Sequence, residues 1–174
     1  MKNLTILDLH NALLEGKITP KELLEQTLAA AKNDNNNAFE YIMEKEAYEA
    51  LEALDQKDKN NILWGIPFVI KDNFSTKDVP TTASSDILVG YKPIFNATVY
   101  ERILNQGGIP IGKTTLDELA LGGTGMSGHL GYTYNPWDKS HSRLVGGSSA
   151  GSASTVAAGI VPLGVTLSTL NIYV

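Results

Sequence analysis

The sequence predicts an α/β domain with a parallel or mixed sheet, and three observations support this fold class. Short, nearly continuous apolar runs occur at residues 63–70, 109–113 and 160–162, as expected for strands that are covered on both faces. Residues 98–106 and 150–158, which separate these runs, read as helices. The chain has 174 residues and is 43% hydrophobic and 19% charged, which suffices for one ordinary domain with its own core.

The sequence predicts an acidic helical region in the N-terminal third, residues 1–62. We expect this region to pack on or beside a sheet domain formed by residues 63–174. Residues 5–15 place Ile6, Leu9 and Leu13 on one helical face. The sequence Thr19-Pro20-Lys21-Glu22 combines an N-cap, a proline at the first helical position and a capping-box glutamate, and its helix extends to about Lys32. Residues 45–56 predict a third, mostly solvated helix.

Composition excludes several classes of protein. Residues 1–60 hold 7 basic and 12 acidic side chains and thus the whole net charge of −5, and no basic patch typical of nucleic-acid binding occurs. The absence of cysteine excludes disulfides, zinc–cysteine sites and cysteine nucleophiles. The uncharged stretch after Leu144 is interrupted by polar residues and Pro162, so we expect a soluble, cytoplasmic protein without a membrane span.

The second half of the chain supplies the remaining elements. The first apolar run ends in Lys71-Asp72-Asn73, and Gly107-Gly108 ends the helix at 98–106. After the run at 109–113, the pattern Thr115-x-x-Glu118 predicts a capped short helix. A glycine-rich connection, residues 122–147, leads to a helix of small residues at 150–158, and residues 160–162 begin another strand.

Residues 123–128 match G-x-G-x-x-G, the fingerprint of a dinucleotide-binding loop. That fingerprint requires a strand before the loop and an acidic residue about 20 positions later. Here a predicted helix precedes the loop, and no carboxylate side chain follows Asp138. The pattern therefore favours a wall of some other site over cofactor binding.

Residues 146–152, Gly-Gly-Ser-Ser-Ala-Gly-Ser, have three interpretations. A phosphate loop is weak because the lysine that follows its last glycine is missing. A nucleophile elbow with Ser149 fits G-x-S-x-G, but that fold places its histidine after the serine, whereas all three histidines precede it. A structural role, in which small residues let a helix approach a sheet, remains equally open on this stretch alone.

Lys71 favours a catalytic interpretation because it ends a buried strand. An ordinary lysine would extend to solvent or pair with Asp72. A desolvated lysine has a lowered pKa and can act as a general base through a serine such as Ser148.

These residues carry a resemblance to a known family. Residues 65–73, which end in Lys71-Asp72-Asn73, and residues 146–153 resemble the two N-terminal hallmarks of the amidase signature family. Residues 112–122 and 135–138 are similar to one branch of it, the A subunits of bacterial glutamyl-tRNA(Gln)/aspartyl-tRNA(Asn) amidotransferases. The similarity runs from about residue 4 to Pro162, in the family's order and spacing. It implies the N-terminal portion of an α/β/α sandwich with a mixed sheet.

The resemblance also implies a chemistry. Lys71 corresponds to the lysine of the family's Ser–cis-Ser–Lys triad and Ser148 to its cis-serine; the lysine accepts a proton through the cis-serine, and a second serine attacks a carboxamide. For this branch the substrate is glutamine, and the partners are the B and C subunits of a heterotrimer. This chain would bind no cofactor or metal, whereas the B subunit would hold ATP, Mg²⁺ and the mischarged tRNA that receives the ammonia.

After Pro162 the sequence departs from the family, which continues to a G-S-D-T-G-G-S stretch with the nucleophile and the oxyanion backbone. Counted from Ser148 without gaps, the nucleophile falls on Ile172, which has no nucleophilic atom, and Ser168 lacks the preceding motif. We expect a truncated or frameshifted chain, inactive on its own, rather than a genuine short homologue. The alternatives are a non-catalytic amidase-fold fragment and another amidase-signature carboxamide hydrolase.

Overall fold

A computed structural model describes residues 4–167, and its centre is a four-stranded mixed sheet in the order β1-β3-β2-β4. β2 (Pro67–Lys71) pairs in parallel with β3 (Ile109–Thr114) on one side and with β4 (Leu163–Val165) on the other. β1 (Phe39–Ile42) pairs antiparallel with β3. The predicted α/β class with a mixed sheet is confirmed.

The helices of the first third begin where their caps predict. In α1 (Ile6–Leu14) and α2 (Pro20–Lys32), reciprocal hydrogen bonds join Thr5 to Asp8 and Thr19 to Glu22 as capping boxes. Such a cap stabilises a helix by about 1 kcal/mol because it satisfies amide groups that have no partner within the helix. α3 (Glu44–Glu52) follows, with a short 3-10 turn at Leu54–Gln56.

β1 was not anticipated by the sequence, although it lies among the predicted N-terminal helices. Its four residues are too few to show a strand period, and the asparagines at positions 35–37 before it read only as a helix end. Asn37 adopts a left-handed conformation with φ of 53°, and the chain then turns into the edge of the sheet. The backbone N–H of Met43 adds a further hydrogen bond of 2.9 Å to Ile111 of β3.

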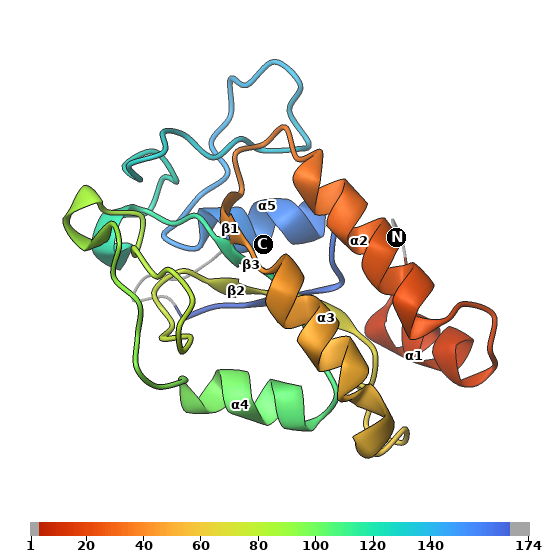
Figure 1. The fold of residues 1–174 in the computed structure, drawn as a ribbon. Coiled ribbons are helices and arrows are strands. Elements are labelled where there is room, and N and C mark those ends of the chain that lie inside the picture. Colours follow the sequence, from red (N-terminus) through yellow and green to blue (C-terminus); the bar gives the residue numbers. More distant parts are fainter. Residues whose placement is uncertain (1–3, 168–174) are drawn as a thin grey trace.

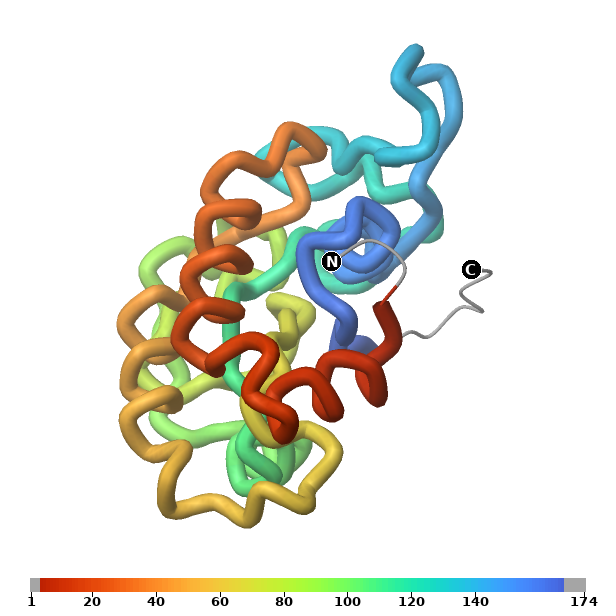
Figure 2. The backbone as a smooth tube through the Cα atoms, turned by 90° about the vertical axis from the view of Figure 1, so that its right-hand side faces the viewer, coloured from red at the N-terminus to blue at the C-terminus, as the bar shows by residue number. Residues whose placement is uncertain are grey.

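Different helices cover the two faces of the sheet (Figures 1 and 2). Phe68 and Ile70 of β2 pack with Tyr100 and Ile103 of α4 (Thr98–Asn105). Val69, which alternation places on the opposite face, belongs to the larger core formed with residues of α1, α2 and α3. α5 (Ala150–Ala157) also contacts β2 and β4 (Figure 1). Alternation along β2 places Lys71 on the same face as Val69.

One predicted helix is wrong in detail. Thr115 does not cap a helix with Glu118; its hydroxyl instead contacts Asn37 O and the Thr133 hydroxyl, and only a single 3-10 turn, Glu118–Ala120, follows. The reason is that Thr115 is still buried beside β3, where tertiary partners outcompete a local cap.

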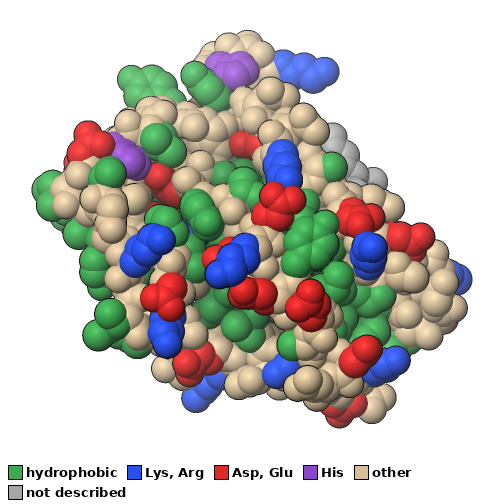
Figure 3. All heavy atoms as spheres, in the orientation of Figure 1, with side chains coloured by type: hydrophobic (Ala, Val, Ile, Leu, Met, Phe, Trp, Pro, Cys, Tyr) green, Lys and Arg blue, Asp and Glu red, His purple; other side chains and the backbone are tan. Residues whose placement is uncertain are grey.

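The surface has the charge pattern that the composition predicts. Figure 3 shows acidic and basic side chains interspersed over the face that carries α2 and α3, without a concentration of basic residues there. Within residues 4–167, no helix has the length and apolar character required to span a bilayer.

Candidate functional site

Lys71 is the last residue of β2 and has no exposed surface. Its Nζ donates a hydrogen bond of 2.8 Å to Ser148 Oγ, although the two residues are 77 positions apart in the chain. A second hydrogen bond of 2.8 Å goes to the backbone oxygen of Leu167, just after β4. The lysine thus lies at the carboxyl ends of two parallel strands, where α/β proteins commonly hold their sites.

Ser148 lies just before the N-terminus of α5 and is fully buried. Two glycines precede it; Gly146 has a left-handed φ of 84°, and the Gly147–Ser148 peptide is cis. Within α5, a Cβ on Gly151 would come within 2.3 Å of Ala38 O. The small-residue interpretation of this stretch therefore holds at Gly151, and it coexists with a serine that contacts the lysine.

Burial lowers the pKa of Lys71 from 10.5 to about 8, and the negative charge of Asp117 partly opposes this shift. The shift follows from the cost of holding an ammonium away from water. With this pKa, about a tenth of the lysine is a neutral amine at pH 7, against less than about a thousandth for an ordinary lysine. A neutral amine can accept the Ser148 proton, which is the first step of a relay.

A cleft of about 680 Å³ opens beside this pair. The residues that flank Ser148 in the chain line it, namely Gly146, Gly147 and Ser149, whereas Lys71 and Ser148 do not. Thr166 lines the cleft too, and its hydroxyl donates to the Ser149 hydroxyl. This volume is within the range of small-molecule sites, so the cleft offers room for a substrate next to the buried pair.

The G-x-G-x-x-G loop reaches the cleft at Gly123, and its next four backbone N–H groups bind a carboxylate of this chain. Gly123 lines the cleft, and the backbone N–H groups of residues 124–127 all point at the carboxylate of Asp117. The donors that a phosphate would require are thus occupied by a side chain of the same chain.

The sequence missed two buried acidic residues and one buried lysine of this region. Asp72 does not pair with Lys71, as an ordinary interpretation of that lysine proposed; its Oδ1 lies 3.0 Å from Nζ of Lys113 on β3. The signal available was that Lys113 and Asp72, like Lys71, lie at the ends of apolar runs. Asp117 had a weaker signal, a carboxylate in the segment that follows β3.

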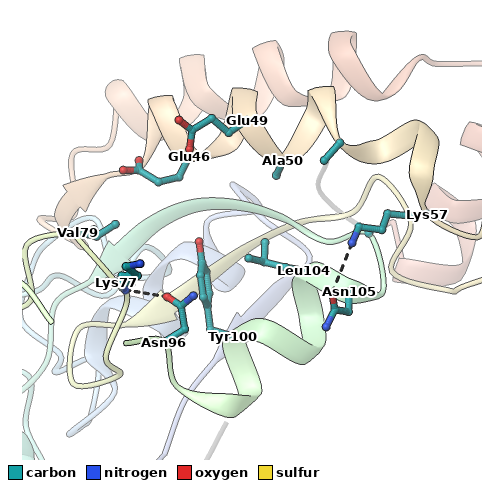
Figure 4. A pocket seen from close by; sticks show the side chains of 12 residues that line it. Glu46, Glu49, Ala50, Lys57, Lys77, Val79, Asn96, Tyr100, Leu104 and Asn105 are labelled. Atoms are coloured by element: carbon teal, nitrogen blue, oxygen red, sulfur yellow. Dashed lines mark hydrogen bonds between the residues drawn. The ribbon is translucent and has the colours of Figure 1, made fainter. Parts of the chain in front are cut away.

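A second hollow, of about 420 Å³, lies between α3 and α4 (Figure 4). Glu46 and Glu49 of α3 lie opposite Tyr100 of α4, and burial together with these two carboxylates raises the pKa of Tyr100. Unlike the cleft, it is lined by none of the residues that flank Ser148 in the chain. The cleft beside Ser148 is therefore the candidate active site.

A buried lysine that contacts a serine next to a glycine-rich loop is the arrangement that the resemblance to the amidase signature family implies. The family model described as Amidase matches residues 22–166. The chain belongs to the amidase signature family.

Within that family, the chain is similar to the A subunit of glutamyl-tRNA(Gln) amidotransferase. It is 45% identical over 165 residues to that protein from Streptococcus pneumoniae strain 70585, and 44% identical to that from Streptococcus thermophilus strain CNRZ 1066. Each match covers 92% of this chain and 33% of the relative, so the chain spans about a third of these proteins.

Solved structures support the same family. A crystal structure of an amidase has a TM-score of 0.78 at 34% identity and covers 91% of this chain and 37% of its own. A 6-aminohexanoate cyclic dimer hydrolase has a TM-score of 0.83 at 26% identity and covers 92% and 33%, respectively.

Proposed function

We propose that this chain provides the lysine and the cis-serine of a glutamine-hydrolysing amidase site, as part of the A subunit of a glutamyl-tRNA(Gln) amidotransferase. The observation that carries the proposal is the 2.8 Å hydrogen bond between Lys71 Nζ and Ser148 Oγ, made inside the protein. The identity to relatives with that name supports the substrate and the branch.

The proposed relay passes protons between Lys71 and the nucleophilic serine through Ser148. The neutral amine of Lys71 accepts the hydroxyl proton of Ser148, and Ser148 takes a proton from the nucleophilic serine as that serine attacks the carboxamide carbon of glutamine. The C–N bond breaks, ammonia leaves with a proton returned through Ser148, and water later hydrolyses the acyl-enzyme. The released ammonia would pass to the B subunit of the assembly, a heterotrimer that the C subunit would complete.

As written, the 174-residue chain is proposed to be inactive by itself. Its residues 163–174 do not contain the G-S-D-T-G-G-S stretch that carries the nucleophile in the family. Ile172, the position that the gap-free count gives for the nucleophile, and Ser168, the nearest alternative, lie outside the described residues. Removing one member of a catalytic triad removes most of its rate advantage, because the members act as a unit.

A chimera tests the proposal. Residues 1–162 replace the corresponding segment of the Streptococcus pneumoniae relative, and ammonia release from glutamine is measured with the B and C subunits present. We expect turnover by the chimera and a loss of at least about 10³-fold in both Lys71→Ala and Ser148→Ala. The 174-residue chain alone should release no more ammonia than its own Lys71→Ala variant.

The matched control is Lys77→Ala, a change of the same chemistry at an exposed lysine after β2. It should leave the chimera's turnover unchanged. A chimera that remains active without Lys71 would contradict the proposed role of this lysine. A 174-residue chain that hydrolyses glutamine in a Lys71-dependent way would contradict the proposal that the chain alone is inactive.

A further inference from the structure

Asp117 is a fully buried carboxylate that lies three residues after β3 and touches the site by its backbone. Its N–H donates a hydrogen bond of 3.0 Å to the backbone oxygen of Ser148. It therefore fixes the peptide unit of the serine that contacts Lys71. The mechanism described above assigns it no part.

The side chain of Asp117 binds the glycine-rich loop that follows Gly123, a residue of the cleft lining. Its carboxylate accepts hydrogen bonds of 3.0–3.3 Å from the backbone N–H groups of residues 124–127 and one of 3.0 Å from Ser127 Oγ. Burial by itself would raise the pKa of Asp117, but these hydrogen bonds from Gly125, Ser127 and Met126 lower it below the ordinary value of 3.8. The carboxylate therefore stays ionised near neutral pH and holds residues 124–127 together.

The surrounding glycines leave space for this carboxylate and nothing larger. A Cβ on Gly147 would lie 2.1 Å from Asp117 Oδ2, and one on Gly122 would lie 2.6 Å from Asp117 Cβ. Gly147 directly precedes Ser148, so the carboxylate packs on the backbone that leads into the serine. Both ends of Asp117 thus act on the same short segment.

We propose that Asp117 is the positioning residue of the Lys71–Ser148 site, joining the loop of residues 124–127 to the Ser148 backbone while its negative charge acts on the buried lysine. This inference rests on the proposed function, which it deepens. Asp117 does not touch the reacting atoms; it acts through Ser148 and through the field at Lys71. A purely structural anchor would hold the loop without affecting the protonation of the lysine.

The test is an NMR titration of Lys71 in the full 174-residue chain labelled with ¹³C at the lysine Cε, with Lys71→Met to assign its signal. Asp117→Asn keeps the shape and removes the charge, so it should lower the pKa of Lys71 by about one unit. Amide exchange of residues 124–127 should become at least about tenfold faster, because the isosteric amide cannot accept all their hydrogen bonds.

The direction of the shift separates this role from simple loss of structure. If the site merely opened, water would reach Lys71 and its pKa would rise toward the ordinary 10.5. A folded Asp117→Asn variant with an unchanged or raised Lys71 pKa would overturn the inference. The control Glu118→Gln makes the same chemical change at the neighbouring exposed carboxylate and should leave the Lys71 titration unaltered.

If Asp117→Asn does not fold, an acid titration of the unaltered chain still tests the inference. As Asp117 is protonated by acid, the amide signals of residues 124–127 and of Ser148 should shift with one shared midpoint below 3.8. Separate midpoints would overturn the inference. A Lys71 pKa near the ordinary 10.5 in the unaltered chain would instead remove the proposed function itself, so the two failures are distinguishable.

Discussion

Two buried lysines end neighbouring strands of the sheet, and their surroundings differ in one respect. Neither Lys71 on β2 nor Lys113 on β3 exposes any surface. Lys113 Nζ lies 3.0 Å from a carboxylate oxygen of Asp72 and also donates to Phe74 O and the Thr81 hydroxyl. Lys71 contacts a hydroxyl and a backbone oxygen, and within the described part of the chain it forms no ion pair.

The difference separates a lysine that supports the fold from one that is available for chemistry. The other oxygen of Asp72 accepts hydrogen bonds from the Thr82 N–H and hydroxyl and from the Ala83 N–H. Asp72 and Lys113 therefore form a buried ion pair: burial lowers the pKa of Lys113, but the adjacent carboxylate opposes the shift. Among the described residues, the charge of Asp117 alone opposes the effect of burial on Lys71, and the pKa of Lys71 falls to about 8.

Lys113→Met should give the largest effect on stability. It leaves the buried Asp72 carboxylate without its cation, and breaking a buried pair in this way costs about 3–5 kcal/mol. Urea unfolding would measure this as a lower free energy of unfolding. Adding Asp72→Asn should recover part of the loss, because the unpaired charge is then gone. A Lys113→Met variant that is as stable as the unaltered chain would show that the Lys113–Asp72 pair contributes nothing to the free energy of unfolding.

Lys71→Met should act in the opposite direction and by less. It removes a buried ammonium that has no carboxylate in contact, while it leaves Ser148 Oγ and Leu167 O without a donor. The net expectation is a gain of about 1 kcal/mol in the free energy of unfolding at pH 7. A clear loss of stability in the same urea experiment would mean that Lys71 supports the fold as Lys113 does, and the comparison would fail.

Lys71 should also give the stability a pH dependence. Its folded pKa of about 8 lies below the unfolded value of 10.5, so the unfolded chain binds more protons in this window. The free energy of unfolding therefore contains a contribution that rises between pH 8 and pH 10.5. Other groups titrate there too, so the informative quantity is the unaltered chain minus Lys71→Met. A difference that stays constant across that window would contradict the lowered pKa.

The comparison also shows what the sequence could predict. β2 and β3 followed from apolar runs, which are local patterns in the chain, and the proximity of Lys71 to Ser148 was implied by the resemblance of two motifs to the amidase signature family. β1 and the partners of Asp72 and Asp117 did not, because each depends on segments brought together by folding. Lys113 lies 41 positions after Asp72, and the loop that surrounds Asp117 was recognisable only as glycine-rich. Local patterns report which side chains end the strands, but not which of them pair.

The most direct test of the account measures both lysines in one experiment. In the unaltered chain labelled with ¹³C at the lysine Cε, the resonance that disappears in Lys71→Met should titrate with a midpoint of about 8. The paired Lys113 should not titrate as low, because Asp72 holds its charge. A Lys71 midpoint near 10.5 would mean that it is an ordinary ammonium at neutral pH, and it would contradict the claim that this lysine is prepared to take a proton from Ser148.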